Sequence, residues 1–585
     1  MSSLWESDAP IRSELFSAER LEQHAESLAT AQRIVQRPGI GRPLAKRLRD
    51  NDKALLDAYR TIAKATHDDD PITPAAEWLV DNFHVVEAQI REIRDDLPPA
   101  FYRQLPKLAD GPFAGYPRVF GIAWAFVAHT DSRFDSEMLC RFVQAYQRVE
   151  ALTIGELWAI AITLRIVLVE NLRRVADRIV VRRAARREAD ILADRLLGVD
   201  DGKPEPATTV LGQIGKTPLE TAFAAQLVHR LHDQHPRATA ALLWLDERLK
   251  AQGTSVDEIV REEHQSQGAH NVTVRNIITG MRLISAVDWP DLFERISLVD
   301  ATLRSGSGFA EMDFPTRDLY RRAIEELARG SSHSELAVAR LALQAAERAG
   351  NDPQNEGGLT STRERDPGYY LIAKGRRSFE KKIGFRVPMR GRLARANAAI
   401  GISGYLGVIA LISAIIVAST LYWGAESKGT WALCLLALAA LIPASEIAIA
   451  LVNRGVTNRF GATILPALEL RDGVPPDLRT MIVIPALLST RAALEQQIEH
   501  LEVHYLSSPD GDLHFALLSD WADSATESAQ GDDALLGAAV EGIAHLNRRY
   551  GPAPAGERFL LLHRRRIWNV GQEVWMGWER KRGKL

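Results

Sequence analysis

The residues best suited to chemistry lie near the C-terminal end of this 585-residue chain. Asp520 ends the apolar run 513–520, and a carboxylate fixed at the end of a strand can accept hydrogen bonds from a nucleotide base or ribose. The segment 578–585 places Arg582 and Lys584 among four cations beside a tryptophan, and such groups suit a diphosphate. The residues therefore predict a nucleotide site that includes Asp520 and the basic segment 578–585. The alternatives are that Asp520 caps a turn or helix and that the basic tail is a solvated helix start.

The elements that must position these residues begin at about residue 479. Apolar runs of strand length alternate there with helical patterns: strands at 480–485, 513–520 and 559–563, and helices at 491–505 and 535–550. This β-α-β-α-β order predicts a parallel sheet with right-handed crossovers, whose ligands bind beyond the carboxyl ends of the strands. Ser519-Asp520 and His563-Arg564 would lie at that edge, together with Pro485-Ala486.

Two uncharged or nearly uncharged apolar runs, 398–423 and 431–452, precede this segment. The first would form a helix of about 39 Å, which is enough to cross a hydrocarbon core of about 30 Å. We therefore predict a transmembrane hairpin. Glu446 lies inside the second run, where a carboxylate is costly; it either faces a polar interior or lies near the cytoplasmic end and reaches out to the interface.

Basic residues predict the topology of this hairpin. Nine cations crowd the approach to the first run: Lys374, Arg376, Arg377, Lys381, Lys382, Arg386, Arg390, Arg392 and Arg395. The break between the runs holds only Glu426 and Lys428, so both flanks should face the cytoplasm. The N-terminus has no continuous apolar stretch of the secretory kind. We expect a multi-pass membrane protein with cytoplasmic N-terminal and C-terminal segments, and the cations could also contact anionic lipid.

Residues 1–350 are predicted to be rich in helices. Helical spacing of apolar residues runs from Pro74 to Leu97, and Thr153 with Glu156 forms a capping-box pattern before the long helical segment 157–197. Charged residues interrupt that segment, so we expect a buried soluble helix and no third span. The predicted organisation is a helical cytoplasmic domain, a linker with a basic juxtamembrane segment, two transmembrane helices, a connector and an α/β domain: 1–350, 351–397, 398–453, 454–478 and 479–585.

Composition narrows the possible classes of function. The net charge of −3 argues against bulk binding of nucleic acid. Cys140 and Cys434 are the only cysteines, and their positions make a disulfide framework unlikely. His129, Asp131 and Asp135 could form a metal cluster, but such a group more often marks the end of a helix.

Several longer motifs resemble the bacterial cyclic β-1,2-glucan synthases. In the N-terminal region they are Glu77–His84, Gly115–Val119, His129–Phe134 and Leu152–Trp158. After the hairpin, Leu501–Tyr505, Leu517–Trp521 and Trp578–Leu585 are similar to the opening of that family's membrane glycosyltransferase domain. The resemblance runs in order along most of the chain, on both sides of the hairpin.

This resemblance implies a processive transferase of the bacterial inner membrane that moves glucose from UDP-glucose onto a growing β-1,2-glucan, using a GT-A nucleotide-sugar fold. It places Asp520 at the uridine and Arg582 and Lys584 near the diphosphate. Many related transferases carry two acids at the second strand, whereas Ser519 precedes Asp520 here. The alternative function is that of a non-catalytic, membrane-anchored assembly or regulatory subunit.

The same resemblance predicts that part of the enzyme is missing from this chain. The complete enzyme is expected to bind a divalent cation, Mg or Mn, through an Asp-X-Asp type motif and to use a further carboxylate as base. The chain ends at Leu585, before the position at which the resemblance places either feature. We thus expect an incomplete GT-A-like domain, inactive alone, whose partner is the remaining C-terminal portion on the same or another chain.

Overall fold

The computed structural model describes residues 8–585 except 36–40, 69, 200–205, 213, 215–217, 233–237, 351–362, 425–428, 460–463 and 509. The chain forms two compact units. One comprises Met1–Ser307 and Tyr320–Ile400, and the other comprises Gly308–Leu319 and Gly401–Leu585. The division falls within a single helix, α15 (Phe314–Arg329). Each unit is described by itself.

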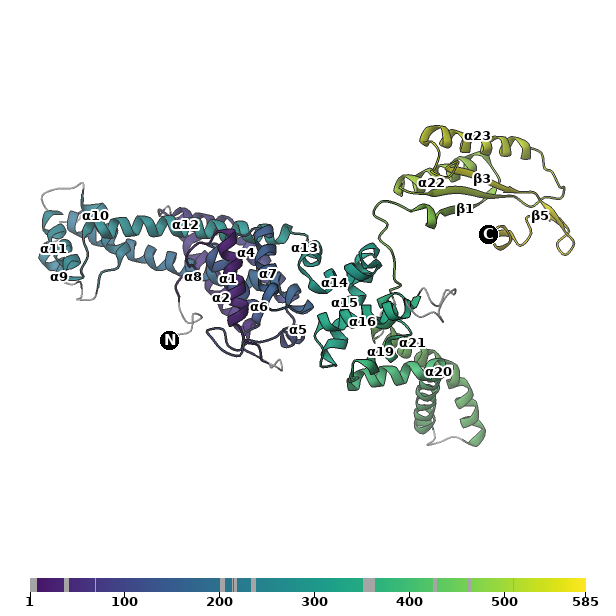
Figure 1. The fold of residues 1–585 in the computed structure, drawn as a ribbon, viewed down its shortest axis with the longest axis horizontal. Helices are drawn as coiled ribbons and strands as arrows, with labels where there is room; N and C mark the ends of the chain where they lie inside the picture. Colours follow the sequence, from purple (N-terminus) through teal and green to yellow (C-terminus); the bar gives the residue numbers. More distant parts are fainter. Residues whose placement is uncertain are drawn as a thin grey trace. The chain divides into compact units, whose positions relative to one another are not determined.

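The described part of the first unit is helical, as the sequence predicted (Figure 1). Its helices are α1 (Ala18–Ala31), α2 (Leu44–His67), α3 (Pro74–Asp81), α4 (Phe83–Asp96), α5 (Pro99–Gln104), α6 (Arg118–His129), α7 (Ser136–Val149), α8 (Ile154–Leu197), α9 (Ala207–Gly212), α10 (Thr221–His232), α11 (Ala238–Ala251), α12 (Val256–Ala286), α13 (Trp289–Ile296), α14 (Leu298–Gly306), the C-terminal part of α15, α16 (Glu335–Gly350), α18 (Pro367–Leu371) and α19 (Arg376–Lys382). The unit also contains the first turns of α20 (Met389–Gly424).

Helix α8 is the central helix of this unit, and α2, α6, α10 and α12 pack against it. It begins with the predicted capping box, in which Thr153 and Glu156 satisfy each other's backbone donors. The prediction of a buried soluble helix is confirmed. Its charged Glu170 is completely buried but accepts hydrogen bonds from Arg47 and Arg174, both at 2.8 Å. Pairing of this kind offsets the cost of burying a charge.

The segment from Pro74 to Leu97 differs from the prediction in one respect. Its apolar positions are buried as expected, but the segment is two helices, α3 and α4, separated at Asn82. The Asn82 side chain donates to the Trp78 carbonyl at 2.8 Å, and its backbone has left the helical region. Asparagine competes with helical hydrogen bonds in this way, so it allows a break inside an apolar pattern.

The polar group His129, Asp131 and Asp135 forms the end of α6 and the start of α7. His129 stacks on Phe16 with 3.9 Å between ring centroids. Asp131 binds Arg12 through an ion pair of 3.0 Å, and Asp135 caps α7 by accepting from the Met138 amide. Each side chain has its own protein partner, so the structure supports the helix-end interpretation.

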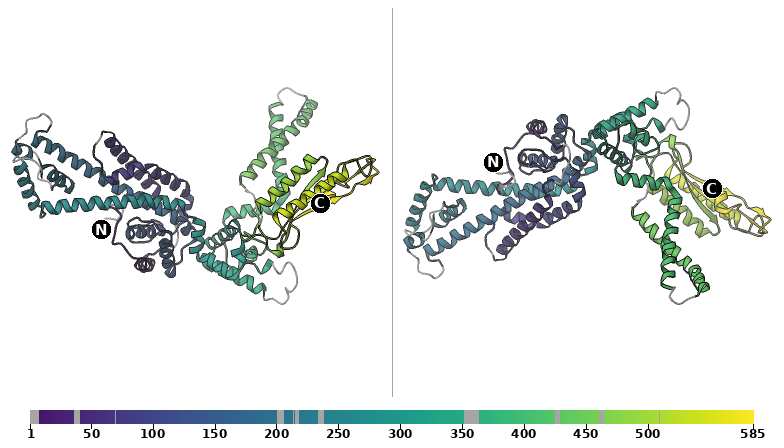
Figure 2. Two further views of the ribbon diagram at one scale, coloured as in Figure 1. Left: turned by 90° about the horizontal axis from the view of Figure 1, so that it is seen from above. Right: turned by 90° about the horizontal axis from the view of Figure 1, so that it is seen from below.

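The second unit contains two helices that are long and apolar enough to span a membrane, Gly401–Gly424 within α20 and Thr430–Asn458 within α21 (Thr430–Arg459). Their side chains are largely exposed, as expected for helices that contact lipid. They form a hairpin (Figures 1 and 2), and Tyr405 Oη donates to Asn453 Oδ1 at 2.8 Å between them. Glu446 is exposed on α21.

Cys140 and Cys434 are both free thiols.

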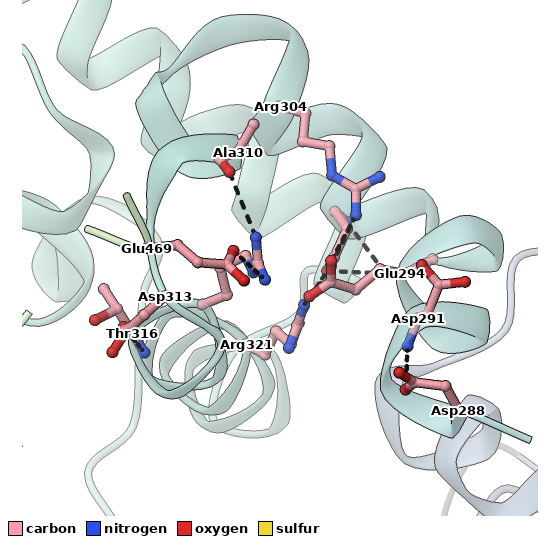
Figure 3. Close-up of polar contacts among 12 residues, drawn as sticks. Asp288, Asp291, Glu294, Arg304, Ala310, Asp313, Thr316, Arg321 and Glu469 are labelled. Carbon is pink, nitrogen blue, oxygen red and sulfur yellow. Dashed lines mark hydrogen bonds and ion pairs between the residues drawn. The ribbon is translucent and has the colours of Figure 1, made fainter. Parts of the chain in front are cut away.

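A short backbone pairing holds the chain that leaves this hairpin. Met312 and Leu468 form an antiparallel bridge. The Asp313 amide donates to the Ala467 carbonyl at 3.0 Å, and the Glu469 amide donates to the Glu311 carbonyl at 2.9 Å. We call residues 311–313 and 467–469 the clip. It lies beside η1 (Gly308–Glu311) and the start of α15. Figure 3 labels its residues Asp313 and Glu469 and the neighbouring Thr316 of α15.

The α/β region follows the clip. After η4 (Pro476–Leu478) come β1 (Thr480–Leu488), α22 (Arg491–Ser507), β2 (Leu513–Trp521), α23 (Asp532–Tyr550) and β3 (Phe559–Arg564). The three strands are parallel in the order β1-β2-β3, as predicted. Helices α22 and α23 contact each other and cover one face of the sheet (Figure 1). A hairpin of β4 (Ile567–Asn569) and β5 (Val574–Met576) and the short helix α24 (Arg580–Lys584) complete the region.

Candidate functional site at the carboxyl end of the sheet

The register of the sheet brings polar residues together at its carboxyl edge. Strand β2 lies in the middle and is buried along its whole length. Leu487, Asp520 and Arg564 occupy the same row across β1, β2 and β3. Because the strands are parallel, residues 44 positions apart in sequence, Asp520 and Arg564, become direct neighbours.

Asp520 is only 2% exposed and is paired on both oxygens. Arg564 donates from Nε to Oδ1 at 2.7 Å and from Nη2 to Oδ2 at 2.9 Å, a bidentate geometry that gives strong charge-assisted hydrogen bonds. Burial alone would raise the pKa of Asp520, but the hydrogen bonds from Arg564 and the nearby Lys584 ammonium outweigh it and hold the pKa below its ordinary value. The carboxylate is therefore ionised.

Lys584 completes the cluster from α24. Its ammonium lies 3.3 Å from Asp520 Oδ2 and donates to the Ala486 carbonyl at 2.8 Å. Lys584 thus connects β1 to β2, because it contacts Ala486 on one strand and Asp520 on the other. Arg564, which lies on β3, connects that strand to Asp520 on β2. Arg564 also donates to the Trp578 carbonyl at 3.1 Å. The chain from Gly577 to Gly583 lies close above the carboxylate: a methyl group on Gly577 would be 2.9 Å from Asp520 Oδ2.

Arg582 does not join Asp520 and Lys584. Its side chain is 90% exposed, and the ion pair that the structure gives it is a long one, 3.8 Å to Glu579. Of the three residues that the sequence predicted for a donor site, the structure brings together two. Arg564 was placed at the correct edge by the strand pattern but was given no role, because the strand pattern does not show which side chains become neighbours.

A second layer of contacts lies beside the cluster. Ser519 Oγ is 2.9 Å from His563 Nδ1, and His563 Nε2 is buried without a hydrogen-bond partner. Burial lowers the pKa of His563 despite the nearby carboxylates of Asp520 and Asp532, so the imidazole is neutral at physiological pH. Arg566, which is 4% exposed, donates to Asp532 from both terminal nitrogens. These contacts hold the ends of β2 and β3 in place.

The arrangement can bind an anion or a nucleotide more readily than it can transfer a proton. A carboxylate offers about four lone pairs, and Arg564 and Lys584 take three of those of Asp520. By this count, one lone pair of Asp520 has no donor among the residues that the structure describes. Asp520 is thus a buried and largely paired carboxylate. The described residues hold no group of three or more His, Cys, Asp or Glu side chains that could bind a metal ion, so we assign no metal-dependent step to them.

Comparison with known proteins gives a relative of this chain that matches most of its length. No family model matches the chain. It is 41% identical over 541 residues to the cyclic β-(1,2)-glucan synthase NdvB of Rhizobium meliloti (strain 1021), covering 92% of this chain and 19% of that protein. The chain therefore spans about a fifth of the length of this relative. The similarity confirms the resemblance found in the motifs and supports the assignment of this chain to the cyclic β-glucan synthase family.

Proposed function

We propose that this chain is part of a membrane glucosyltransferase that builds cyclic β-1,2-glucan from UDP-glucose, and that residues 479–585 contribute to its donor-nucleotide site. The observation that carries the proposal is the cluster of Asp520, Arg564 and Lys584 at the carboxyl edge of three parallel strands, where α/β folds bind nucleotides. The glucan synthase named above, which is similar along nearly the whole chain, supplies the reaction class. A GT-A-like domain and a multi-pass position in an inner membrane, with both ends of the chain cytoplasmic, belong to the same proposal.

The proposed roles follow from exposure and charge. Asp520 fixes Arg564 and Lys584 and offers its remaining lone pair to the uridine. Arg582, exposed and only weakly paired, is free to turn toward the diphosphate, and Lys584 contributes positive potential beside it. We assign neither a catalytic base nor a ligand for the expected Mg or Mn to this chain. The proposal therefore predicts that the chain alone binds the donor without turnover.

The test is UDP binding by the full chain in lipid nanodiscs, measured by calorimetry. Arg582→Ala should weaken UDP binding about tenfold, which corresponds to the loss of one charge-assisted contact. Arg548→Ala is the matched control: Arg548 is an exposed cation in the last turn of α23, and α23 runs back toward the amino edge of the sheet. Equal affinity of both variants for UDP, or no binding by a chain with a folded sheet, would contradict the proposal.

One observation favours the alternative, a non-catalytic assembly or regulatory subunit anchored in the membrane. Asp520 is buried and already paired, which is also what a purely structural carboxylate would show. The same titration separates the two functions, because a structural cluster would retain no UDP whichever exposed cation is replaced.

A further inference from the structure

The segment before the first membrane-spanning helix carries an exposed basic surface. We define the juxtamembrane surface by six exposed cations: Lys374, Arg377, Lys381, Lys382, Arg386 and Arg392. Within the part of the chain that the structure describes, none of these side chains has an ion pair or a hydrogen bond. The only acidic residue between Lys374 and Arg392 is Glu380, and that residue is buried.

Glu380 is occupied by two other cations. It accepts from Arg395 at 2.6 and 2.8 Å and from Arg376 at 3.1 Å. Burial raises the pKa of Glu380, but these hydrogen bonds outweigh burial and lower the pKa below its ordinary value. The ionised carboxylate is therefore paired with Arg376 and Arg395, and Arg376 is also paired with Glu326 at 2.5 Å. Glu380 thus leaves the charge of the juxtamembrane surface uncompensated.

The same ion pair ties α19 to the start of α20. Arg395 lies six residues before Gly401, where the first candidate span begins. At 1.5 Å per residue this is about 9 Å of helix. Since Glu380 holds Arg395 directly, α19 is tied to a point that lies only six residues along the chain from the start of the candidate span. The surface potential of an anionic leaflet extends over a similar distance, about 8–10 Å at physiological ionic strength.

We propose that the juxtamembrane surface binds the headgroups of anionic phospholipids in the leaflet that α20 enters. The proposal rests on the membrane hairpin but not on the donor site. Unpaired cations beside a membrane attract anionic lipid, whereas cations that served only to set the topology would need no folded, tethered helix to display them.

The experiment uses the full chain in phosphatidylcholine nanodiscs that contain a fraction of phosphatidylglycerol. Spin-labelled phosphatidylglycerol and phosphatidylcholine report which lipid the protein retains at its boundary. We expect a preference for phosphatidylglycerol that falls as sodium chloride is added. The triple variant K381Q/K382Q/R386Q should lower this preference at least about twofold, and the charge-retaining variant K381R/K382R should keep it.

The matched control is K46Q/R49Q/R60Q, which removes three exposed cations from α2. It should leave lipid preference unchanged. Cysteine labelling with a membrane-impermeant reagent in sealed phosphatidylcholine vesicles shows that the orientation of the hairpin is the same in every variant. The proposal is overturned if the juxtamembrane variant retains the full preference, or if both triple variants lose it equally. UDP affinity, measured in the same samples, should not follow the lipid preference.

Discussion

Arg564 and Asp520 occupy the same row on two neighbouring parallel strands, and the guanidinium of Arg564 donates to both carboxylate oxygens of Asp520. Lys584 also contacts Asp520 and donates to the Ala486 carbonyl, so it adds β1 to this set of contacts. The carboxyl edge of the sheet is thus held by side chains as well as by the backbone ladder. Any ligand of this edge meets a preformed and net positive surface.

Replacing Asp520 should destabilise the α/β region. Asp520→Ala leaves Lys584, which is 5% exposed, and part of Arg564 buried without a counter-charge, and breaking such a pair costs about 3 kcal/mol. Hydrogen exchange of β2 and β3 in the full chain measures this loss. Asp533→Ala, which removes an exposed acid from the first turn of α23, should cost much less. Similar exchange rates in the two variants would show that the cluster is not stabilising.

Gly577 should tolerate no side chain. A methyl group there would lie 2.9 Å from Asp520 Oδ2 and 3.1 Å from Arg564 Nη2, so Gly577→Ala should push the tail away from the ion pair and weaken UDP binding. Gly537→Ala in α23 is the control, because the added methyl group meets no atom within 4 Å and alanine favours a helix. Thermal unfolding should show a lower melting temperature for the first variant and an equal or higher one for the second.

A buried arginine at α15 offers a test of the first unit. Arg321, which is fully buried, donates to Asp300 at 2.6 and 3.1 Å. It also donates to Glu294 at 2.7 Å (Figure 3). Asp300→Ala should lower the free energy of unfolding by about 3 kcal/mol, since it leaves a buried charge with one partner fewer. Pulse proteolysis measures the loss. The exposed Asp291, on the neighbouring helix α13, gives the control Asp291→Ala, for which we expect little change.

Glu335 should make the stability of the first unit depend on pH. Burial and the nearby Glu325 and Glu156 raise its pKa from 4.5 to about 7, although the Ile154 amide donates to it. The folded state therefore holds a proton that the unfolded state releases between pH 4.5 and 7. The contribution of Glu335 to the free energy of unfolding is fully present below about pH 4.5. It falls as the pH rises to 7, by on the order of 2–3 kcal/mol.

Denaturant titrations at several pH values measure this dependence. Glu335→Gln should remove the fall between pH 4.5 and 7, whereas Glu347→Gln, on the exposed side of the same helix, should preserve it. An unchanged pH profile in Glu335→Gln would assign the dependence to other groups.

Local patterns in the sequence predicted the individual elements well. Strands β2 and β3 match their predicted apolar runs to within one residue, because polar residues bound each run. Strand β1 continues through Pro485, where the sequence predicted its end, to Leu488. The α8 capping box was visible as Thr153 with Glu156 for a similar reason: both of its bonds are made within four residues. The apolar hairpin is equally local, since composition alone marks it.

Interactions that depend on tertiary structure were not predictable in the same way. Whether Asp520 is free or paired depends on strand register and on where the tail from Gly577 returns. Asn82 breaks an apolar helical pattern through one side-chain hydrogen bond. The clip joins backbone groups, so it has no side-chain signature beyond Thr316, whose hydroxyl accepts from the Ala467 amide at 2.9 Å.

The clip also constrains the order of events during synthesis. Met312 pairs with Leu468, and both candidate membrane helices lie between them in sequence. The ribosome therefore releases residues 311–313 long before their partner strand exists, and their backbone donors and acceptors must remain hydrated until the hairpin has been made. Formation of this pairing thus requires that both candidate membrane helices have been synthesised first, so the clip joins the α/β region to earlier polypeptide late in synthesis.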